Sequence, residues 1–209
     1  MPRPRTHDLG RVLDVAEELA VTAGPAAVTI RALSEATSVS NGALYHAFGT
    51  RAGLLGRAWL RAAQGFLQLQ RDAVEKVLGS GDDAADGSAA VEAVVAAALC
   101  PASFFDANPT SAQFLLTVPR EELLRTGEVP DDVAEELRQL DKALGKIFVR
   151  LSCSMWDRKD KQALALIRDC VVALPTALLL RGNRTADDIA RHRLAAAVRA
   201  VLTIPPASD

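Results

Sequence analysis

The strongest constraint on the fold lies in residues 29–51, which read TIRALSEATSVSNGALYHAFGTR. Apolar residues recur there at helical spacing, and Thr29 and Ser40 stand where helix N-caps are expected. Thr37 and Ser38 separate the two apolar segments. The run therefore predicts two short helices joined by a tight turn, with small and polar residues at the start of the second helix.

The second helix has the composition of a helix that enters a DNA major groove. Asn41 can pair with an adenine edge or a phosphate, and Ala43 can contact a thymine methyl group. Tyr45 lies four residues after Asn41 on the same face, and its hydroxyl can donate to a phosphate. The alternative is that Ser40, Asn41 and Gly42 only cap and start a helix.

The same run resembles the DNA-binding signature of TetR-type transcriptional regulators, over roughly residues 9–58. The resemblance implies that Tyr45 and His46 contact the DNA backbone. Arg31 is either a phosphate contact or part of a surface ion pair, and Arg51 keeps the charge of the lysine that is usual there. The expected DNA-binding residues are Thr29, Arg31, Ser40, Asn41, Gly42, Ala43, Tyr45, His46 and Arg51.

The turn departs from the family pattern, because Thr37-Ser38 stands where Ala-Gly is usual. Glycine adopts positive φ freely, whereas serine does not. We therefore expect either strain at Ser38 or a turn of different shape. Leu33-Ser34 replaces the usual Ile-Ala, and neither change removes a group that contacts DNA.

The whole chain of 209 residues reads as all-α, without the alternation that a strand would show. We expect a three-helix helix-turn-helix DNA-binding domain over residues 1–55. A larger helical domain for ligand binding and dimerisation, which the resemblance implies, would span residues 56–209. Residues 79–88 (GSGDDAADGS) lack the apolar content of an ordered element and are expected to form a flexible loop.

Charge separates the two ends of the chain. Residues 1–62 hold seven arginines and five acidic residues, whereas residues 63–209 hold 17 basic and 21 acidic residues. A mildly basic head on an acidic body suits a protein that contacts phosphates at one end.

The sequence does not predict an enzyme. Its histidines are far apart, no glycine-rich phosphate loop is present, and the spacing of Cys100, Cys153 and Cys170 suits neither a metal site nor a disulfide framework. We expect no catalytic residue, no metal and no cofactor, and three buried free thiols.

The N-terminal residues do not form the apolar segment of a signal peptide, and the longest apolar run, residues 170–180, contains Pro175. These patterns predict a cytoplasmic protein that does not bind membranes.

The last two helices are apolar on several faces, which predicts a homodimer interface built as a four-helix bundle. The alternative is that both helices are buried within a monomer. The residues expected at the interface are Leu164, Ile167, Val171, Leu174, Leu178, Leu194, Ala197, Val198 and Val201.

A ligand pocket is expected among the middle helices, where the large apolar side chains gather. Aromatic residues at helical spacing also form ordinary cores, so the same residues fit either role. The candidate pocket residues are Phe66, Phe104, Phe105, Asn108, Gln113, Phe114, Phe148, Arg150, Met155 and Trp156. The set suggests a small, largely apolar effector with few polar anchors.

Together, the residues and the resemblance predict a ligand-responsive transcriptional regulator. We expect a repressor that binds a palindromic operator in double-stranded DNA as a homodimer and is released by a small-molecule effector. One alternative is a DNA-binding regulator whose body binds a protein partner and no small ligand. Another is a small helical enzyme or carrier that shares only the head.

Overall fold

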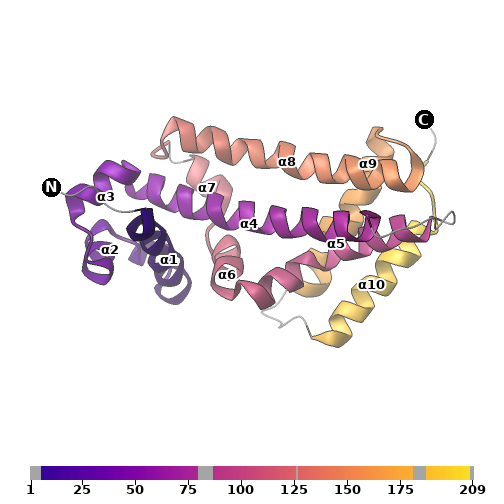
Figure 1. Cartoon of the computed structure of the whole chain (residues 1–209), viewed down its shortest axis with the longest axis horizontal. Helices are drawn as coiled ribbons and strands as arrows, with labels where there is room; N and C mark the ends of the chain where they lie inside the picture. The colour runs from indigo at the N-terminus through magenta and orange to yellow at the C-terminus, as the bar shows by residue number, and fades with distance from the viewer. Residues whose placement is uncertain (1–5, 80–86, 126, 181–186, 208–209) are drawn as a thin grey trace. The chain divides into compact units, whose positions relative to one another are not determined.

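The structure is a computed structural model that describes residues 6–79, 87–125, 127–180 and 187–207. Every regular element in these ranges is helical, which confirms the predicted all-α class (Figure 1). Most of the predicted flexible loop, residues 80–86, lies outside the described residues.

The chain divides into two compact units. Unit 1 comprises Met1–Gly65 and Asn108–Leu140, and unit 2 comprises Phe66–Ala107 and Asp141–Asp209. Two long helices, α4 (Arg51–Gly79) and α8 (Asp131–Trp156), therefore contribute to both units. The predicted boundary at residue 55 divides a DNA-binding domain from a domain for ligand binding and dimerisation, and it stays a prediction. The compact units themselves group residues 108–140 with the N-terminal helices.

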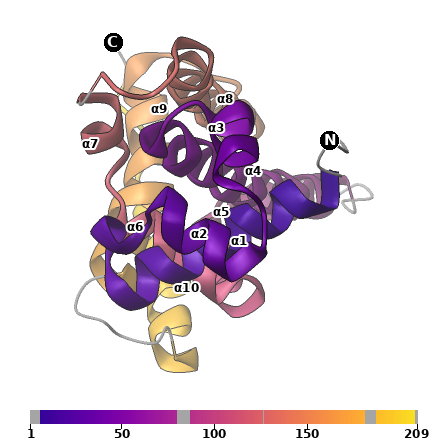
Figure 2. The same cartoon turned by 90° about the vertical axis from the view of Figure 1, so that its left-hand side faces the viewer.

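Unit 1 begins with a cluster of three helices: α1 (Thr6–Ala23), α2 (Ile30–Thr37) and α3 (Asn41–Phe48) (Figures 1 and 2). Helix α1 ends just before Gly24, and the short helix η1 (Pro25–Ala27) leads into α2. Helix α6 (Pro109–Thr117) packs against α1, and α7 (Arg120–Arg125) follows it. Fully buried side chains at the centre of this unit are Val12, Ala16, Ala20, Val28, Leu44, Leu54 and Phe114.

Unit 2 contains α5 (Ser88–Ala107), α9 (Lys161–Arg168) and α10 (Asp188–Leu202). After α9 the chain continues through two π-helical stretches, η2 (Asp169–Ala173) and η3 (Thr176–Leu180). Helix α5 packs against both α10 and η2, so it is the central helix of this unit. Its apolar character around most of its circumference follows from this position.

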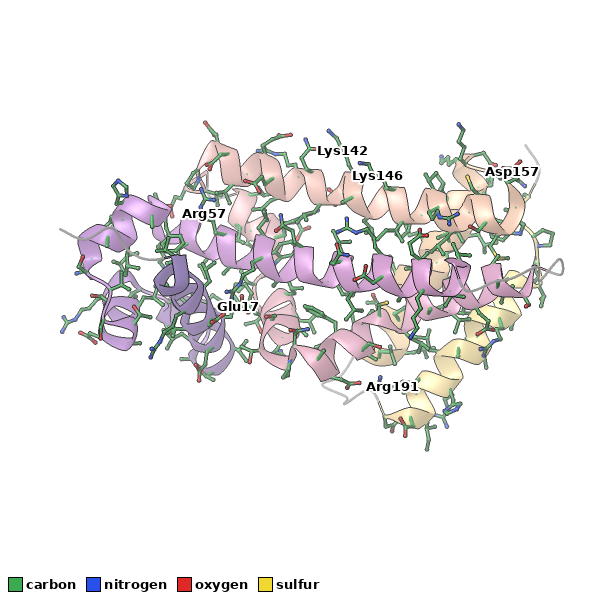
Figure 3. All side chains as sticks on the ribbon, viewed as in Figure 1. Glu17, Arg57, Lys142, Lys146, Asp157 and Arg191 are labelled. Atoms are coloured by element: carbon green, nitrogen blue, oxygen red, sulfur yellow. The ribbon has the colours of Figure 1, made fainter. Side chains whose placement is uncertain are left out.

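The segment between α8 and α9 contains a left-handed residue, Asp157, which has φ 53° and follows the end of α8 (Figure 3). The carboxylate of Asp160 caps α9, accepting hydrogen bonds from the backbone N–H groups of Gln162 and Ala163, both at 3.1 Å. A hydrogen bond from Arg158, together with the backbone N–H of Ala163, lowers the pKa of Asp160. The cap therefore stays ionised at neutral pH.

Two helical stretches, Ser88–Ala107 and Lys161–Leu180, are long and apolar enough to cross a membrane by length and composition alone. Core helices of folded domains meet the same criterion. Here α5 supplies much of the core of unit 2, including Ala93, Val94, Ala97 and Phe104.

Of the three cysteines, Cys100 and Cys170 are buried and Cys153 is only partly buried, so the prediction of three buried thiols is wrong for Cys153. Burial raises the pKa of Cys100 to about 12 and that of Cys170 to about 11. Both thiols therefore remain protonated, as apolar core groups.

Candidate nucleic-acid interface

Two side-chain caps fix the starts of the helix-turn-helix. The Thr29 hydroxyl oxygen accepts a hydrogen bond from the backbone N–H of Ala32 at 3.1 Å. The Ser40 hydroxyl oxygen accepts one from Ala43 at 3.2 Å. Both predicted caps are confirmed. Since each cap satisfies an otherwise unpaired donor, α2 and α3 begin at defined residues.

The turn between α2 and α3 keeps the shape that glycine usually supplies. Ser38 adopts the left-handed conformation, with φ 58° and ψ 18°, and its N–H donates to the Ser34 carbonyl at 2.9 Å. The Thr37 hydroxyl donates to the Leu33 carbonyl at 2.6 Å. Of the two expectations for this turn, strain at Ser38 is therefore the one observed.

Helix α3 has one buried face and one exposed face. Leu44 and Phe48 pack into the core of unit 1. Asn41, Gly42 and His46 are exposed, Ala43 is half-buried, and Tyr45 is 56% exposed although it is a large aromatic residue. An exposed face that combines an amide, a phenol and an imidazole matches what base edges and phosphates require.

Arg31 forms the surface ion pair that was one of its two predicted roles. Its Nε lies 2.8 Å from Oε1 of Glu35, one helical turn away, and both side chains are largely exposed. Exposed pairs of this kind contribute only about 0–1 kcal/mol, so a phosphate can replace Glu35 at little cost.

Arg51 has partners within the chain. Its Nε donates to the Val28 carbonyl at 2.5 Å, and its Nη2 donates to the Pro25 carbonyl. These bonds tie the start of α4 to the segment between α1 and α2. The structure thus gives Arg51 a bracing role that the sequence did not predict.

An ionic network around the buried Glu17, which the sequence analysis missed, connects three helices of unit 1. Glu17 on α1 is 2% exposed, and its carboxylate accepts hydrogen bonds from Arg61 Nη2 and from the Ser111 hydroxyl, both at 2.6 Å (Figure 3). Arg61 also contacts Asp14 at 2.8 Å. Burial opposes the charge of Arg61, but the bond to Glu17 and the nearby carboxylates raise its pKa on balance. The position of Glu17 beside the buried Ala16 and Ala20 was the available signal.

The predicted pocket residues are divided between the two compact units. Asn108, Gln113 and Phe114 belong to unit 1, whereas the other candidates belong to unit 2. The buried aromatic residues fill the cores, and the rings of Phe66 and Phe104 meet edge to face with centroids 5.6 Å apart.

The polar anchors expected in the pocket have other surroundings. Arg150 is exposed and donates to both carboxylate oxygens of Glu75, at 3.0 and 3.2 Å, and its role in a pocket stays a prediction. Gln113 donates to the Thr117 hydroxyl on its own helix at 3.4 Å. Asn108 precedes α6 without capping it through its side chain.

Two of the hollows in the described part of the chain are considered as candidate sites, and each lies within one unit. In unit 1, a cleft of about 470 Å³ is lined by Asp14, Glu17, Glu18, Val21, Thr22 and residues 108–111. In unit 2, a groove of about 390 Å³ has an apolar floor and a charged rim; it is lined by Val77, Glu92, Val95, Ala96, Leu99, Arg191, His192, Ala195 and Arg199. The sequence analysis identified none of the rim residues. The bidentate pairing of Arg199 with Glu92, at 2.7 Å for each bond, joins positions far apart in the chain.

Four of the predicted interface residues are buried within the protomer: Ile167, Val171, Leu194 and Val198. A side chain that is already packed inside one chain cannot contact a partner, so their assignment to an interface is wrong. Leu164, Leu174, Leu178, Ala197 and Val201 are half-buried. The exposed apolar residues on the same segments include Val172, Ile189 and Ile204.

The π-helical turns explain the shift of the buried face. Buried positions recur at Ala163, Ile167, Val171, Pro175 and Leu179, every fourth residue. An α-helix of 3.6 residues per turn cannot keep that spacing on one face, whereas wider π turns can. The predicted stripe assumed a regular α-helix throughout.

Among the residues that the structure describes, no group of three or more His, Cys, Asp or Glu side chains is placed to hold a metal ion. The candidate binding sites are therefore the exposed face of α3 and these two hollows.

Comparisons with known proteins fit this geometry. Residues 12–58 match the family model of bacterial regulatory proteins of the tetR family. A search of curated proteins finds no sequence that matches the chain. Among solved structures, a bacterial regulatory protein in the tetR family from Rhodococcus RHA1 is 19% identical, with a TM-score of 0.65 over 98% of this chain and 100% of that chain.

Two further structures share the fold. A TetR family transcriptional regulator from Thermus thermophilus is 18% identical, with a TM-score of 0.63 over 92% of this chain and 97% of that chain. The ketosteroid transcriptional regulator of Mycobacterium tuberculosis is 14% identical, with a TM-score of 0.57 over 99% of this chain and 98% of that chain. The helix-turn-helix of this chain thus matches the model of bacterial regulatory proteins of the tetR family, and nearly the whole chain shares the fold of solved structures named for that family.

Proposed function

We propose that the protein is a cytoplasmic, non-enzymatic repressor that binds a palindromic operator as a homodimer and leaves it when a small, largely apolar effector binds. The observation that carries the proposal is the exposed face of α3, held by the caps of Thr29 and Ser40 and backed by buried Leu44 and Phe48.

On DNA, α3 of each protomer would lie in a major groove, with half-site centres about 34–36 Å apart or a multiple of that distance. Asn41 would select bases, while Tyr45 and His46 would bind phosphates. Thr29 and Ser40 would hold phosphates at helix N-termini, and Gly42 and Ala43 would allow close approach. Arg31 would join them by exchanging Glu35 for a phosphate, whereas Arg51 would act chiefly by bracing η1.

For the dimer, the exposed apolar side chains of unit 2 are the available contact surface. Val172 is 40% exposed on η2, and the small residues Ala173, Thr176 and Ala177 lie beside it on the exposed side. On α10 and just beyond it, Ala200 and Ile204 are exposed as well. We propose this surface in place of the buried members of the predicted set. It suits an isologous contact, in which the same patch meets itself.

The apolar floor of the groove in unit 2 supports an effector of apolar character, with the charged rim as its polar anchor. One solved structure of this fold is named as a ketosteroid transcriptional regulator, and ketosteroids are largely apolar compounds. Effector and operator would then oppose each other by a coupling free energy, typically about 1–3 kcal/mol, and the coupling must be reciprocal.

The filled aromatic core favours a second candidate function. Because Phe104 and Phe148 are buried and packed, unit 2 can also serve as an interaction surface for a protein partner, with no small ligand. A thermal-shift screen of apolar compounds separates the two. A compound that raises Tm and weakens operator binding supports the effector hypothesis. The affinity of the protein for that compound must then fall, when the protein is bound to the operator, by the same factor by which the compound weakens operator binding.

Selection of binding sites from random double-stranded DNA, at about 150 mM salt, tests DNA recognition and dimeric readout together. We expect a palindrome with two half-sites. If the selection enriches no sequence and the protein binds DNA only in a salt-sensitive, non-specific way, the proposal is wrong.

A further inference from the structure

The start of α4 is fastened to a segment far along the chain. The Thr50 hydroxyl accepts a hydrogen bond from the Gly53 N–H at 2.9 Å, which caps α4. The same hydroxyl donates to the Glu128 carbonyl at 2.8 Å. Residues 128–133, here called the α7–α8 corner, therefore bind the helix cap that follows α3 directly.

Two glycines let the α7–α8 corner approach α4 closely. A Cβ atom on Gly56 would lie 2.9 Å from Cγ1 of Val133. One on Gly53 would first meet the backbone oxygen of Phe48 and would lie 2.9 Å from Cδ of Pro130. Val133 is 1% exposed. Glycine inside a helix costs about 1 kcal/mol relative to alanine, so this close contact gives both residues a packing reason.

An ion pair lies one turn further along the same face. Arg57 Nη2 is 2.8 Å from Oδ2 of Asp132, and Figure 3 shows Arg57 on the side of α4 that faces the start of α8. Arg57 Nε is buried and has no hydrogen-bond partner in the structure. An unpaired buried donor is unfavourable, and the ion pair with Asp132 joins the same guanidinium to the start of α8.

The next turn of α4 is also held from outside the helix-turn-helix. Trp59 Nε1 donates to the Val118 carbonyl, between α6 and α7, at 2.9 Å. The guanidinium of Arg120 lies over the Trp59 ring, 6.0 Å from its centroid. From Thr50 to Trp59, α4 is thus contacted at each turn by residues 118–133, all within unit 1.

We infer that the α7–α8 corner is a positioning element for DNA recognition, with Gly53, Gly56, Arg57 and Asp132 as its positioning residues. It sets the direction of the first turns of α4, and α4 in turn sets the angle at which α3 is presented. The inference deepens the proposed function and rests on it, since it names the contact through which a movement of α8 would reach the recognition helix.

The first test compares two glycine-to-alanine variants. Gly145 lies in α8 with open space where a Cβ would be, so Gly145→Ala is the matched control for Gly56→Ala. We expect Gly56→Ala to lower affinity for the selected operator at least tenfold while affinity for random DNA stays within twofold. Gly145→Ala should leave both affinities unchanged and raise Tm. Equal operator affinities for the two variants would overturn the inference.

The second test uses two neighbouring carboxylates in case Gly56→Ala fails to fold. Asp131 and Asp132 both stand in the first turn of α8, but the ion pair with Arg57 involves Asp132. Asp132→Asn should speed amide hydrogen exchange in residues 41–48 relative to Asp131→Asn. The exchanged pair Arg57→Asp with Asp132→Arg should restore slow exchange and operator affinity. Equal exchange in the two single variants would overturn the inference.

Hydrogen exchange also separates this inference from the proposed function, because it needs no DNA. If the wild-type protein selects no operator, the proposed function fails, and the exchange contrast still decides whether the corner positions α3.

Discussion

Residues 29–51 and residues 161–180 are both short, helical and rich in apolar side chains, yet only the first follows its sequence pattern. In the first, exposed polar residues alternate with the buried Leu33, Leu44 and Phe48. In the second, apolar residues surround the helix, and π turns select which of them are buried. The difference teaches that the spacing of apolar residues identifies the buried face of a helix only where polar residues occupy the opposite face.

Deletion of a core side chain tests this comparison with the largest effect. Leu44→Ala removes a fully buried side chain and should cost about 2–5 kcal/mol of unfolding free energy. Leu174→Ala, at a half-buried position of the predicted stripe, should cost clearly less. Urea denaturation of both variants measures the difference. Equal losses would mean that the regular stripe, and not the π-shifted face, describes the second segment.

A charge on the exposed face of the second segment tests the proposed dimer surface. Val172→Asp should weaken self-association by about 100-fold, because an aspartate would be desolvated without a partner there. Leu116, which is 49% exposed in unit 1, provides the matched control as Leu116→Asp. Light scattering over a concentration series should show monomers for Val172→Asp alone. A dimer that survives this change uses another surface.

Relief of the turn in the first segment should have a smaller effect. Ser38→Gly removes a side chain from a left-handed residue and should stabilise the protein by about 1 kcal/mol. Ser34→Gly, inside α2, should instead destabilise it by a similar amount. Thermal unfolding distinguishes the two. Destabilisation by Ser38→Gly would show that the left-handed conformation carries no strain.

The smallest effect concerns the thiols of unit 2. Burial raises the pKa of Cys100 to about 12 and that of Cys170 to about 11, so neither forms thiolate at pH 8. Since the thiolate is the reactive form, iodoacetamide should modify Cys153 first, and the buried pair only after unfolding. Mass spectrometry of the labelled native protein checks this order. Early labelling of Cys170 would contradict the burial of the second segment.

Local chemistry explains what could be predicted from the sequence. The caps formed by Thr29, Ser40 and Thr50 bond to residues three positions away, and the left-handed Ser38 follows from one substitution in a turn. Each of these features depends on neighbours in the chain, so a sequence pattern contains it.

Long-range pairing explains the features that could not be predicted from the sequence. The bond from Arg61 to Glu17 joins residues 44 positions apart, and that from Thr50 to Glu128 joins residues 78 apart. Hydrophobic periodicity contains no information about such partners. The roles of aromatic residues such as Phe104 and Phe114 could not be predicted either. An aromatic residue in a core and one in a pocket wall recur at the same helical spacing in the sequence.

The central claim is that α3 reads DNA through Asn41 and holds it through Tyr45. The direct measurement is the affinity of Asn41→Ala and Tyr45→Phe for every single-base variant of the selected operator. The account predicts that Asn41→Ala changes base preference at one position of each half-site, where a correct contact is worth about 1–3 kcal/mol. Tyr45→Phe should weaken all sequences about equally. Unchanged binding by both variants would contradict the placement of α3 in the major groove.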